Sequence, residues 1–106
     1  WSYKTDCCGA SASVNDADQS QLLMSRIFTD AVARGANCLV ATCPLCQFNL
    51  EKSQPRVAES DTGYTPVPVV YFTQALGLAL GQDIETLGFE KNSSDIMPLL
   101  KKKGIA

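Results

Sequence analysis

The sequence predicts a small α/β domain in which helices flank a short parallel sheet. Two short apolar runs, residues 38–42 and 67–71, have the uniform hydrophobicity of strands that are buried on both faces. A segment with helical signals lies between them, and strands joined through a helix run parallel with a right-handed crossover. The 106 residues are enough for one domain with a single hydrophobic core.

Helices are expected on both sides of the first apolar run. Residues 18–34 have the apolar spacing of an amphipathic helix, and Gly35 suits its C-terminal cap. A second helix should begin at Pro44, because proline fits the first turn of a helix. It should end before Pro55, because proline in a helix interior removes a hydrogen bond and clashes with the preceding turn.

The rest of the chain is expected to contain loops, one further helix and a weakly patterned tail. Residues 6–16 and 59–66 are small and polar, which is typical of loops. Residues 73–80 predict a helix, and residues 83–88 predict a short turn or helix. From Asn92 onward the apolar residues show little periodicity, so no element is predicted there.

Composition argues against two classes of partner. The formal net charge is −2, whereas nucleic-acid binding needs a basic patch, and the one basic run, Lys101 to Lys103, is interpreted as a solvated tail. No apolar stretch is long enough to span a bilayer, and the first residues lack the apolar region of a signal peptide. A cytoplasmic location is therefore expected. Because the chain begins with Trp1 and not with Met, we expect it to be part of a longer polypeptide.

The chemistry of the sequence is concentrated in its cysteines. There are five cysteines and no histidine, which excludes His-containing zinc sites and Cys–His dyads within this chain. Cys7 and Cys8 are adjacent and are followed by Gly9, whereas Cys43 and Cys46 form a C-x-x-C after the first predicted strand. Ligand sites in α/β sheets lie at this end of a strand, and a helix start favours thiolate over thiol. The four cysteines are therefore predicted to form one ligand set.

Thiolates are soft ligands that select zinc, copper(I) or iron–sulfur centres. Cys7 and Cys8 point to opposite sides in an extended backbone, so they suit two irons of a cluster better than one tetrahedral zinc ion. A structural four-thiolate zinc site, a metal-free interaction domain and a dithiol oxidoreductase using Cys43 and Cys46 stay open as alternatives. Cys38 lies within an apolar run and is interpreted as an inert core thiol.

The cysteine motifs also resemble a known family. Residues 4–11 read Lys-Thr-Asp-Cys-Cys-Gly-Ala-Ser, and their spacing to residues 43–46 resembles the cysteine-rich CCG domain. The segments 35–37 and 69–77 are similar to the same family, in particular to the second such domain in the B subunit of heterodisulfide reductase. The resemblance implies a Rossmann-like fold. It also implies that the whole chain, residues 1–106, is one CCG domain from the C-terminal part of a two-domain protein.

The resemblance further implies a cofactor and a reaction. Members of this family bind a non-cubane [4Fe–4S] cluster through five cysteines, four of which would be Cys7, Cys8, Cys43 and Cys46 here. The fifth lies upstream of this chain in the family pattern, so the fragment alone could lack the cluster and is expected to be inactive. The implied function is that of an oxidoreductase subunit that reduces a disulfide or transfers electrons through its cluster. Its expected partners are a disulfide substrate and the other subunits of a heterodisulfide-reductase-like complex.

Overall fold

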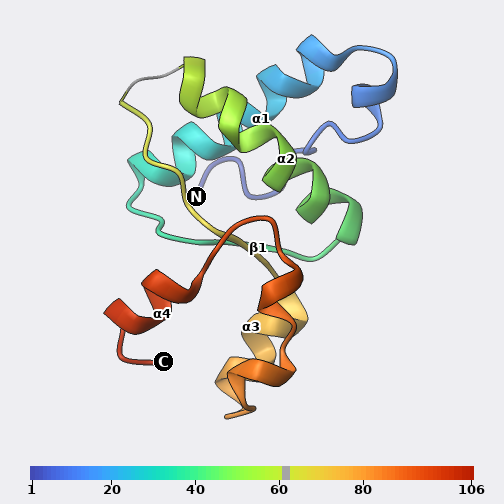
Figure 1. Ribbon diagram of the computed structural model, residues 1–106. Coiled ribbons are helices and arrows are strands. Elements are labelled where there is room, and N and C mark those ends of the chain that lie inside the picture. Colours follow the sequence, from blue (N-terminus) through green and yellow to red (C-terminus); the bar gives the residue numbers. More distant parts are fainter. Residues whose placement is uncertain (61–62) are drawn as a thin grey trace.

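The centre of the computed structural model, which describes residues 1–60 and 63–106, is a pair of short parallel strands (Figure 1). Strand β1 (Leu39–Ala41) pairs with β2 (Val69–Tyr71), with Leu39 opposite Val69 and Ala41 opposite Tyr71. Helix α2 (Pro44–Ser60) lies between them in the chain, as parallel strands require. The predicted parallel pair is therefore confirmed, and the helix-rich arrangement around it is compatible with the α/β class.

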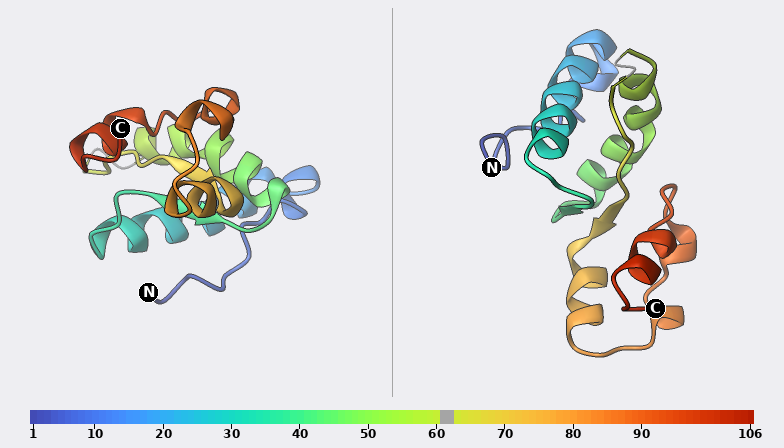
Figure 2. Two further views of the ribbon diagram at one scale, coloured as in Figure 1. Left: turned by 90° about the horizontal axis from the view of Figure 1, so that it is seen from below. Right: turned by 90° about the vertical axis from the view of Figure 1, so that its left-hand side faces the viewer.

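Helices lie on both sides of the strands. Figure 1 and the right-hand view of Figure 2 show α1 (Ala17–Ala33) and α2 above the strands and the C-terminal helices below them. The lower group contains α3 (Phe72–Ala79) and α4 (Met97–Lys102). Short 3-10 helices complete the chain: η1 (Ala12–Val14), η2 (Ile84–Thr86) and η3 (Phe89–Lys91).

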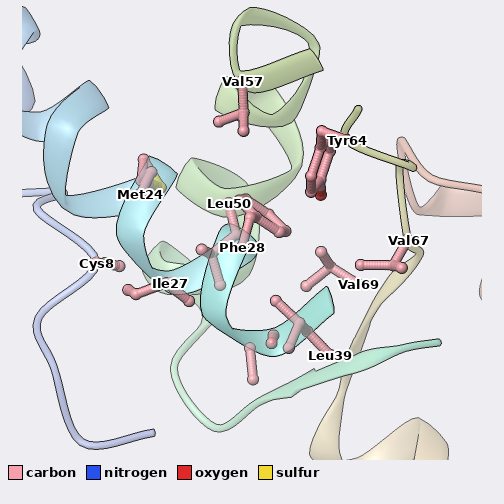
Figure 3. Close-up of a cluster of buried hydrophobic side chains, with 12 residues drawn as sticks. Cys8, Met24, Ile27, Phe28, Leu39, Leu50, Val57, Tyr64, Val67 and Val69 are labelled. Carbon is pink, nitrogen blue, oxygen red and sulfur yellow. The ribbon is translucent and has the colours of Figure 1, made fainter. Parts of the chain in front are cut away.

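The larger hydrophobic core lies between the strands and the upper helices (Figure 3). Leu39 and Val69 contribute to it from the sheet, and Met24 and Phe28 of α1 are fully buried within it. The ring of Phe28 packs edge-on against Tyr64, with 6.0 Å between the ring centroids. This core therefore fixes α1 and α2 above one face of the strands.

A smaller core lies on the opposite face. Its buried residues are Val70, Phe89, Ile96 and Leu100, so it joins β2 to the C-terminal segments. The side chain of Val40 in β1 remains 55 % exposed. The prediction of a buried strand is therefore confirmed for Leu39 and Ala41 but wrong for Val40, which lies on the lower face.

The first helix follows its local signals closely. Helix α1 matches the predicted range of 18–34 to within one residue at each end. The backbone N–H of Gln19 donates to Oδ1 of Asp16 at 3.0 Å, which caps the start of the helix. Gly35 has a φ of +86°, a left-handed conformation that suits the residue after a helix.

The second helix begins at Pro44 as predicted, but the prediction that it ends before Pro55 is wrong. Helix α2 continues through Pro55 to Ser60. The continuation buries Val57, whose exposed fraction is 1 %, and Gln54 is buried one residue before the proline. A proline in a helix interior costs about 3 kcal/mol, and the packing of these side chains offsets that cost.

The C-terminal region contains one confirmed element and one that the sequence did not indicate. Helix η2 lies within residues 83–88, where a short turn or helix is predicted. The tail beyond Asn92 contains α4, contrary to the expectation of a segment without regular structure. Only two side chains of this tail are buried, those of Ile96 and Leu100, and two are too few to show the periodicity of a helix. Lys101 and Lys102 are exposed at the end of α4, as expected for solvated residues.

The predicted loops at 6–16 and 59–66 are only partly as expected. The first contains η1, and the second begins inside α2, whereas residues 63–68 have no helix or strand. Residues 61 and 62 of this predicted loop lie outside the described residues. Within the described part of the chain, none of the helices has the length and apolar character needed to span a bilayer.

Candidate cysteine site

The two cysteine motifs are in contact in the structure. The CCG loop (residues 7–9) lies against the first turn of α2, which carries Cys46. The sulfur atoms of Cys8 and Cys46 lie 3.1 Å apart, although the residues are 38 positions apart in the chain. Cys8 is buried, with an exposed fraction of 5 %. The Nδ2 group of Asn49 donates a hydrogen bond of 3.0 Å to the carbonyl oxygen of Cys8. This bond fixes the loop against α2 and keeps the Cys8 thiol facing Cys46.

Gly9 allows this loop to approach α1. Its φ is +76°, and a Cβ atom built there would lie 3.1 Å from both the Cα of Ser20 and the Cδ1 of Leu23. A side chain at this position would have a strained backbone and would crowd the helix. The glycine of the CCG motif therefore serves to bring the two preceding cysteines close to the protein core.

Cys7 and Cys8 have different surroundings, as expected for adjacent residues. Cys7 is exposed, and its sulfur accepts a hydrogen bond of 3.4 Å from the backbone N–H of Gly9. Cys8 points into the larger core beside Ile27 (Figure 3). The loop therefore presents one thiol to solvent and one to the interior.

Cys43 and Cys46 differ in their acidity. Cys43 is exposed just before Pro44, and backbone N–H groups of Cys46 and then Leu45 lower the pKa of its thiol. Burial, followed by the hydrogen bond with Cys8, raises the pKa of Cys46 to about 12. In the metal-free protein the C-x-x-C therefore contains one thiol that readily becomes a thiolate and one that keeps its proton.

The structure therefore brings only some of the four predicted cysteine ligands into contact. Cys46 is in contact with Cys8 and forms a side-chain hydrogen bond with Cys43, whereas Cys7 lies on the outer side of its loop. Across residues 1–60 and 63–106, no three His, Cys, Asp or Glu side chains form a group that could hold a metal ion. A four-thiolate zinc site therefore gains no support from this arrangement, and the ligand role of the four cysteines stays a prediction.

A cavity of about 190 Å³ lies beside the Cys8–Cys46 pair. Its wall includes all of β1 and Thr42 after it, so the cavity runs along that strand to its carboxyl end, where sites in α/β sheets form. The N-terminal segment closes another side of the cavity, through Trp1, Tyr3, Lys4, Thr5 and Asp6.

Sequence reasoning missed Asn49, the residue that connects the two motifs. Asn49 lies three residues after Cys46 and is therefore on the same side of α2. A polar amide on the buried row of a helix, beside Leu50, is the signal that could have identified it.

Cys38 does not belong to this group. It packs against the smaller core on the opposite face of the strands, and burial raises the pKa of its thiol. Its sulfur lies 3.6 Å from the carbonyl oxygen of Leu39. This environment agrees with the interpretation of Cys38 as a core thiol.

Comparison with known proteins places the cysteine motifs in a family. The model of the cysteine-rich CCG domain family matches residues 2–51. The chain is 34 % identical over 102 residues to the B subunit of the ferredoxin:CoB-CoM heterodisulfide reductase of Methanosarcina mazei, which covers 93 % of this chain and 34 % of the relative. The B subunit of the ferredoxin/F(420)H(2)-dependent CoB-CoM heterodisulfide reductase of Methanosarcina acetivorans has the same identity and coverage.

A third relative comes from a different enzyme. The chain is 36 % identical over 97 residues to the 8-methylmenaquinol:fumarate reductase membrane anchor subunit of Wolinella succinogenes, which covers 91 % of this chain and 34 % of that protein. The chain therefore spans about a third of the length of the curated relatives that it matches.

Proposed function

Because the chain belongs to the cysteine-rich CCG domain family, as found in the B subunit of heterodisulfide reductase, we propose that it is the cluster-binding domain of an oxidoreductase subunit. In this proposal, residues 1–106 form one CCG domain of a longer, two-domain subunit located in the cytoplasm. The subunit either reduces a disulfide or transfers electrons to a partner subunit. Electron transfer is included because one relative is named as a subunit of a fumarate reductase.

The observation that supports the proposal most strongly is the contact between the two cysteine motifs. Cys8 of the CCG loop and Cys46 of the C-x-x-C are in contact at 3.1 Å, beside a cavity at the carboxyl end of β1. The β1–α2–β2 unit is the repeating unit of Rossmann-like folds, and we propose that arrangement for the complete domain.

The donor set fits an iron–sulfur group. All four predicted ligands are cysteines, and thiolate is the ligand that such clusters use. Each iron of a cluster takes its own thiolate, so an exposed Cys7 beside a buried Cys8 suits a cluster better than one zinc ion, which needs its thiolates in a single tetrahedron. We propose that Cys7, Cys8, Cys43 and Cys46 hold a [4Fe–4S] cluster, which resemblance to the family suggests is of the non-cubane type.

The protein's own residues prepare this site in distinct ways. The backbone N–H groups at the start of α2 favour the thiolate of Cys43, so this ligand is ready to bind metal. Asn49 and Gly9 fix the loop that carries the other two cysteines. Metal binding must displace the proton that Cys46 holds, so loading should release protons. When bound, the cluster would supply single electrons for cleaving a disulfide or for transfer to a partner.

The proposal is tested by counting iron and acid-labile sulfide after anaerobic purification of the natural gene product that contains this chain. We expect this domain to contribute about four of each. The Cys8→Ser variant should lose them, whereas Cys38→Ser, which changes a thiol in the other core, should retain them. Zinc without sulfide, or no metal in the unaltered protein, would contradict the proposal and favour a structural cysteine-rich domain.

A further inference from the structure

We propose that Cys8 and Cys46 form a reversible disulfide when no cluster is bound, and that this bond closes the site to metal. The disulfide itself rests on the geometry of the two thiols. Its role in blocking metal rests on the proposed function, because it matters only if these cysteines are ligands.

The first support is the distance between the two sulfur atoms. A disulfide bond is about 2.05 Å long, so sulfur atoms that lie 3.1 Å apart need to move by only about 1 Å. The two residues lie on facing segments, the CCG loop and the first turn of α2, and Asn49 ties the backbone of Cys8 to that helix. The pair is therefore held together by the fold before any bond forms.

The second support is that the other thiols have other environments. Cys7 is exposed on the outer side of the loop, where its sulfur accepts a hydrogen bond from Gly9. Cys38 packs in the smaller core on the opposite face of the strands. Cys43 also lies near Cys46, but it is exposed, and its sulfur accepts backbone hydrogen bonds at the start of α2. The sequence alone favours a bond within the C-x-x-C, whereas the structure favours the long-range pair.

The reaction needs an oxidant, and a small-molecule disulfide supplies it. The Cys46 sulfur is the more accessible of the two: it gives up its proton, attacks the small disulfide and forms a mixed disulfide, and the proton leaves with the small thiol that is released. Because burial raises the pKa of Cys46, this step is slow near pH 7, and the oxidation is carried out under mildly alkaline conditions. The Cys8 sulfur then attacks Cys46, forms the internal bond and releases the second small thiol. Overall, two protein thiols are oxidised and one small disulfide is reduced to two thiols.

The consequence concerns metal loading. The bond would occupy one cysteine of each motif, so half of the four predicted ligands would be unable to bind iron. A reducing thiol would reverse the reaction and reopen the site. Oxidation in the absence of the cluster would therefore protect these thiols and delay loading until reducing conditions return.

Peptide mapping tests the pairing directly. The metal-free, reduced protein is treated with glutathione disulfide, quenched with acid, alkylated and digested with trypsin without reductant. Cleavage after Lys4, Arg26, Arg34 and Lys52 gives one peptide with Cys7 and Cys8 (residues 5–26) and another with the remaining three cysteines (residues 35–52). We expect these two peptides to be joined, with Cys8 linked to Cys46 and the other three cysteines alkylated.

Variants separate the possible pairings. Cys43→Ser should retain the link between the two peptides, whereas Cys46→Ser should lose it, and circular dichroism checks that each variant is folded. The proposal is overturned if the second peptide contains an internal bond and is not joined to the first. It is also overturned if folded Cys43→Ser loses the link.

Iron loading then tests the consequence for the site. Iron and sulfide are offered to the oxidised natural gene product that contains this chain, and to the same protein after reduction with dithiothreitol. We expect loading to be lost in the oxidised sample and restored by reduction. Equal loading of both samples would overturn the blocking role, whereas no loading of either would count against the proposed function and leave the mapped disulfide standing.

Discussion

The two faces of the sheet differ in what they bury. The upper core contains the buried polar side chains Ser20, Asn49 and Gln54 beside its apolar residues, and it adjoins the cysteine site. Within the described part of the chain, the lower core buries four residues and leaves Leu76 of α3 and Leu80 just after it exposed. The family match at residues 2–51 covers α1, β1 and the start of α2, all of which belong to the upper face. The comparison indicates that the upper face positions the chemistry, and the lower face supports the second strand.

Buried hydrogen bonds account for part of this difference. The Oε1 atom of Gln54 accepts from the Tyr64 hydroxyl and from the backbone N–H of Val67, and its Nε2 group donates to the Val67 carbonyl at 2.8 Å. These bonds fix the chain as it enters β2. From the C-terminal segment, the Ser94 hydroxyl donates to the carboxylate of Glu51 in α2 at 2.6 Å and accepts from the backbone N–H of Val69 at 2.9 Å. Polar contacts thus join both faces to the same strand.

The largest effect is expected from removing the central side chain of the upper core. Phe28→Ala should lower the free energy of unfolding by about 4 kcal/mol, because it leaves a cavity where the ring now packs against Tyr64. Urea denaturation measures the loss. Leu22→Ala in the exposed part of the same helix is the matched control, with little change expected. A loss of less than about 1 kcal/mol for Phe28→Ala would show that this core does not hold the upper face together.

A smaller effect is expected in the lower core. Leu100→Ala should cost about 3 kcal/mol, because Leu100 is buried against the segments that cover β2. Leu80→Ala, at an exposed position, should cost much less. The Cys8–Cys46 link should still form in Leu100→Ala at a temperature where the variant is folded. Loss of the link in folded Leu100→Ala would show that the lower core affects the cysteine site, which would contradict the separate roles assigned to the two faces.

The buried amide of α2 offers a third test. Gln54→Ala should cost about 2 kcal/mol, because it leaves the Tyr64 hydroxyl and the Val67 backbone without their partner. Gln82→Ala, which changes an exposed glutamine, should be close to neutral. Thermal unfolding compares the two variants. Equal stability of both would indicate that water replaces the lost bonds and that the amide does not fix the entry to β2.

The smallest effect concerns reactivity and not folding. Because backbone N–H groups lower the pKa of Cys43, a larger fraction of this thiol is ionised near pH 7 than for an ordinary cysteine, whose pKa is about 8.5. The pKa of Cys46 is raised to about 12, so Cys46 stays protonated there. Iodoacetamide should therefore modify Cys43 first in the reduced, metal-free protein, as followed by mass spectrometry. Faster modification of Cys46 would contradict the assigned difference.

Local signals predicted much of the fold. The apolar spacing and Gly35 gave the range of α1, and the two apolar runs gave the parallel pair. The passage of α2 through Pro55 could not be predicted, because it depends on the burial of Val57 against residues far away in the sequence. Helix α4 was missed for the same reason, since Leu100 in the helix and Ile96 just before it are buried against Val70 of β2 and Phe89, which are distant in the sequence or lie outside the helix.

The sequence predicts a set of four cysteines for the candidate site but does not indicate how they are arranged. The motifs indicated that four cysteines belong together, and the helix start explains the acidity of Cys43. The contact between Cys8 and Cys46 depends on the packing of the loop against α1 at Gly9 and on the bond from Asn49. Neither contact leaves a periodic signal in the sequence, so the choice of partner required the structure.

Iron K-edge X-ray absorption on the anaerobically purified natural gene product tests the central claim most directly. The account predicts iron coordinated by sulfur, with a second iron at short range, as a cluster held by thiolates requires. Cys46→Ser should abolish this signal, and Cys38→Ser should leave it unchanged. An absorption edge from zinc alone, or iron surrounded by oxygen and nitrogen, would contradict the assignment of the CCG loop and the C-x-x-C as one iron–sulfur site.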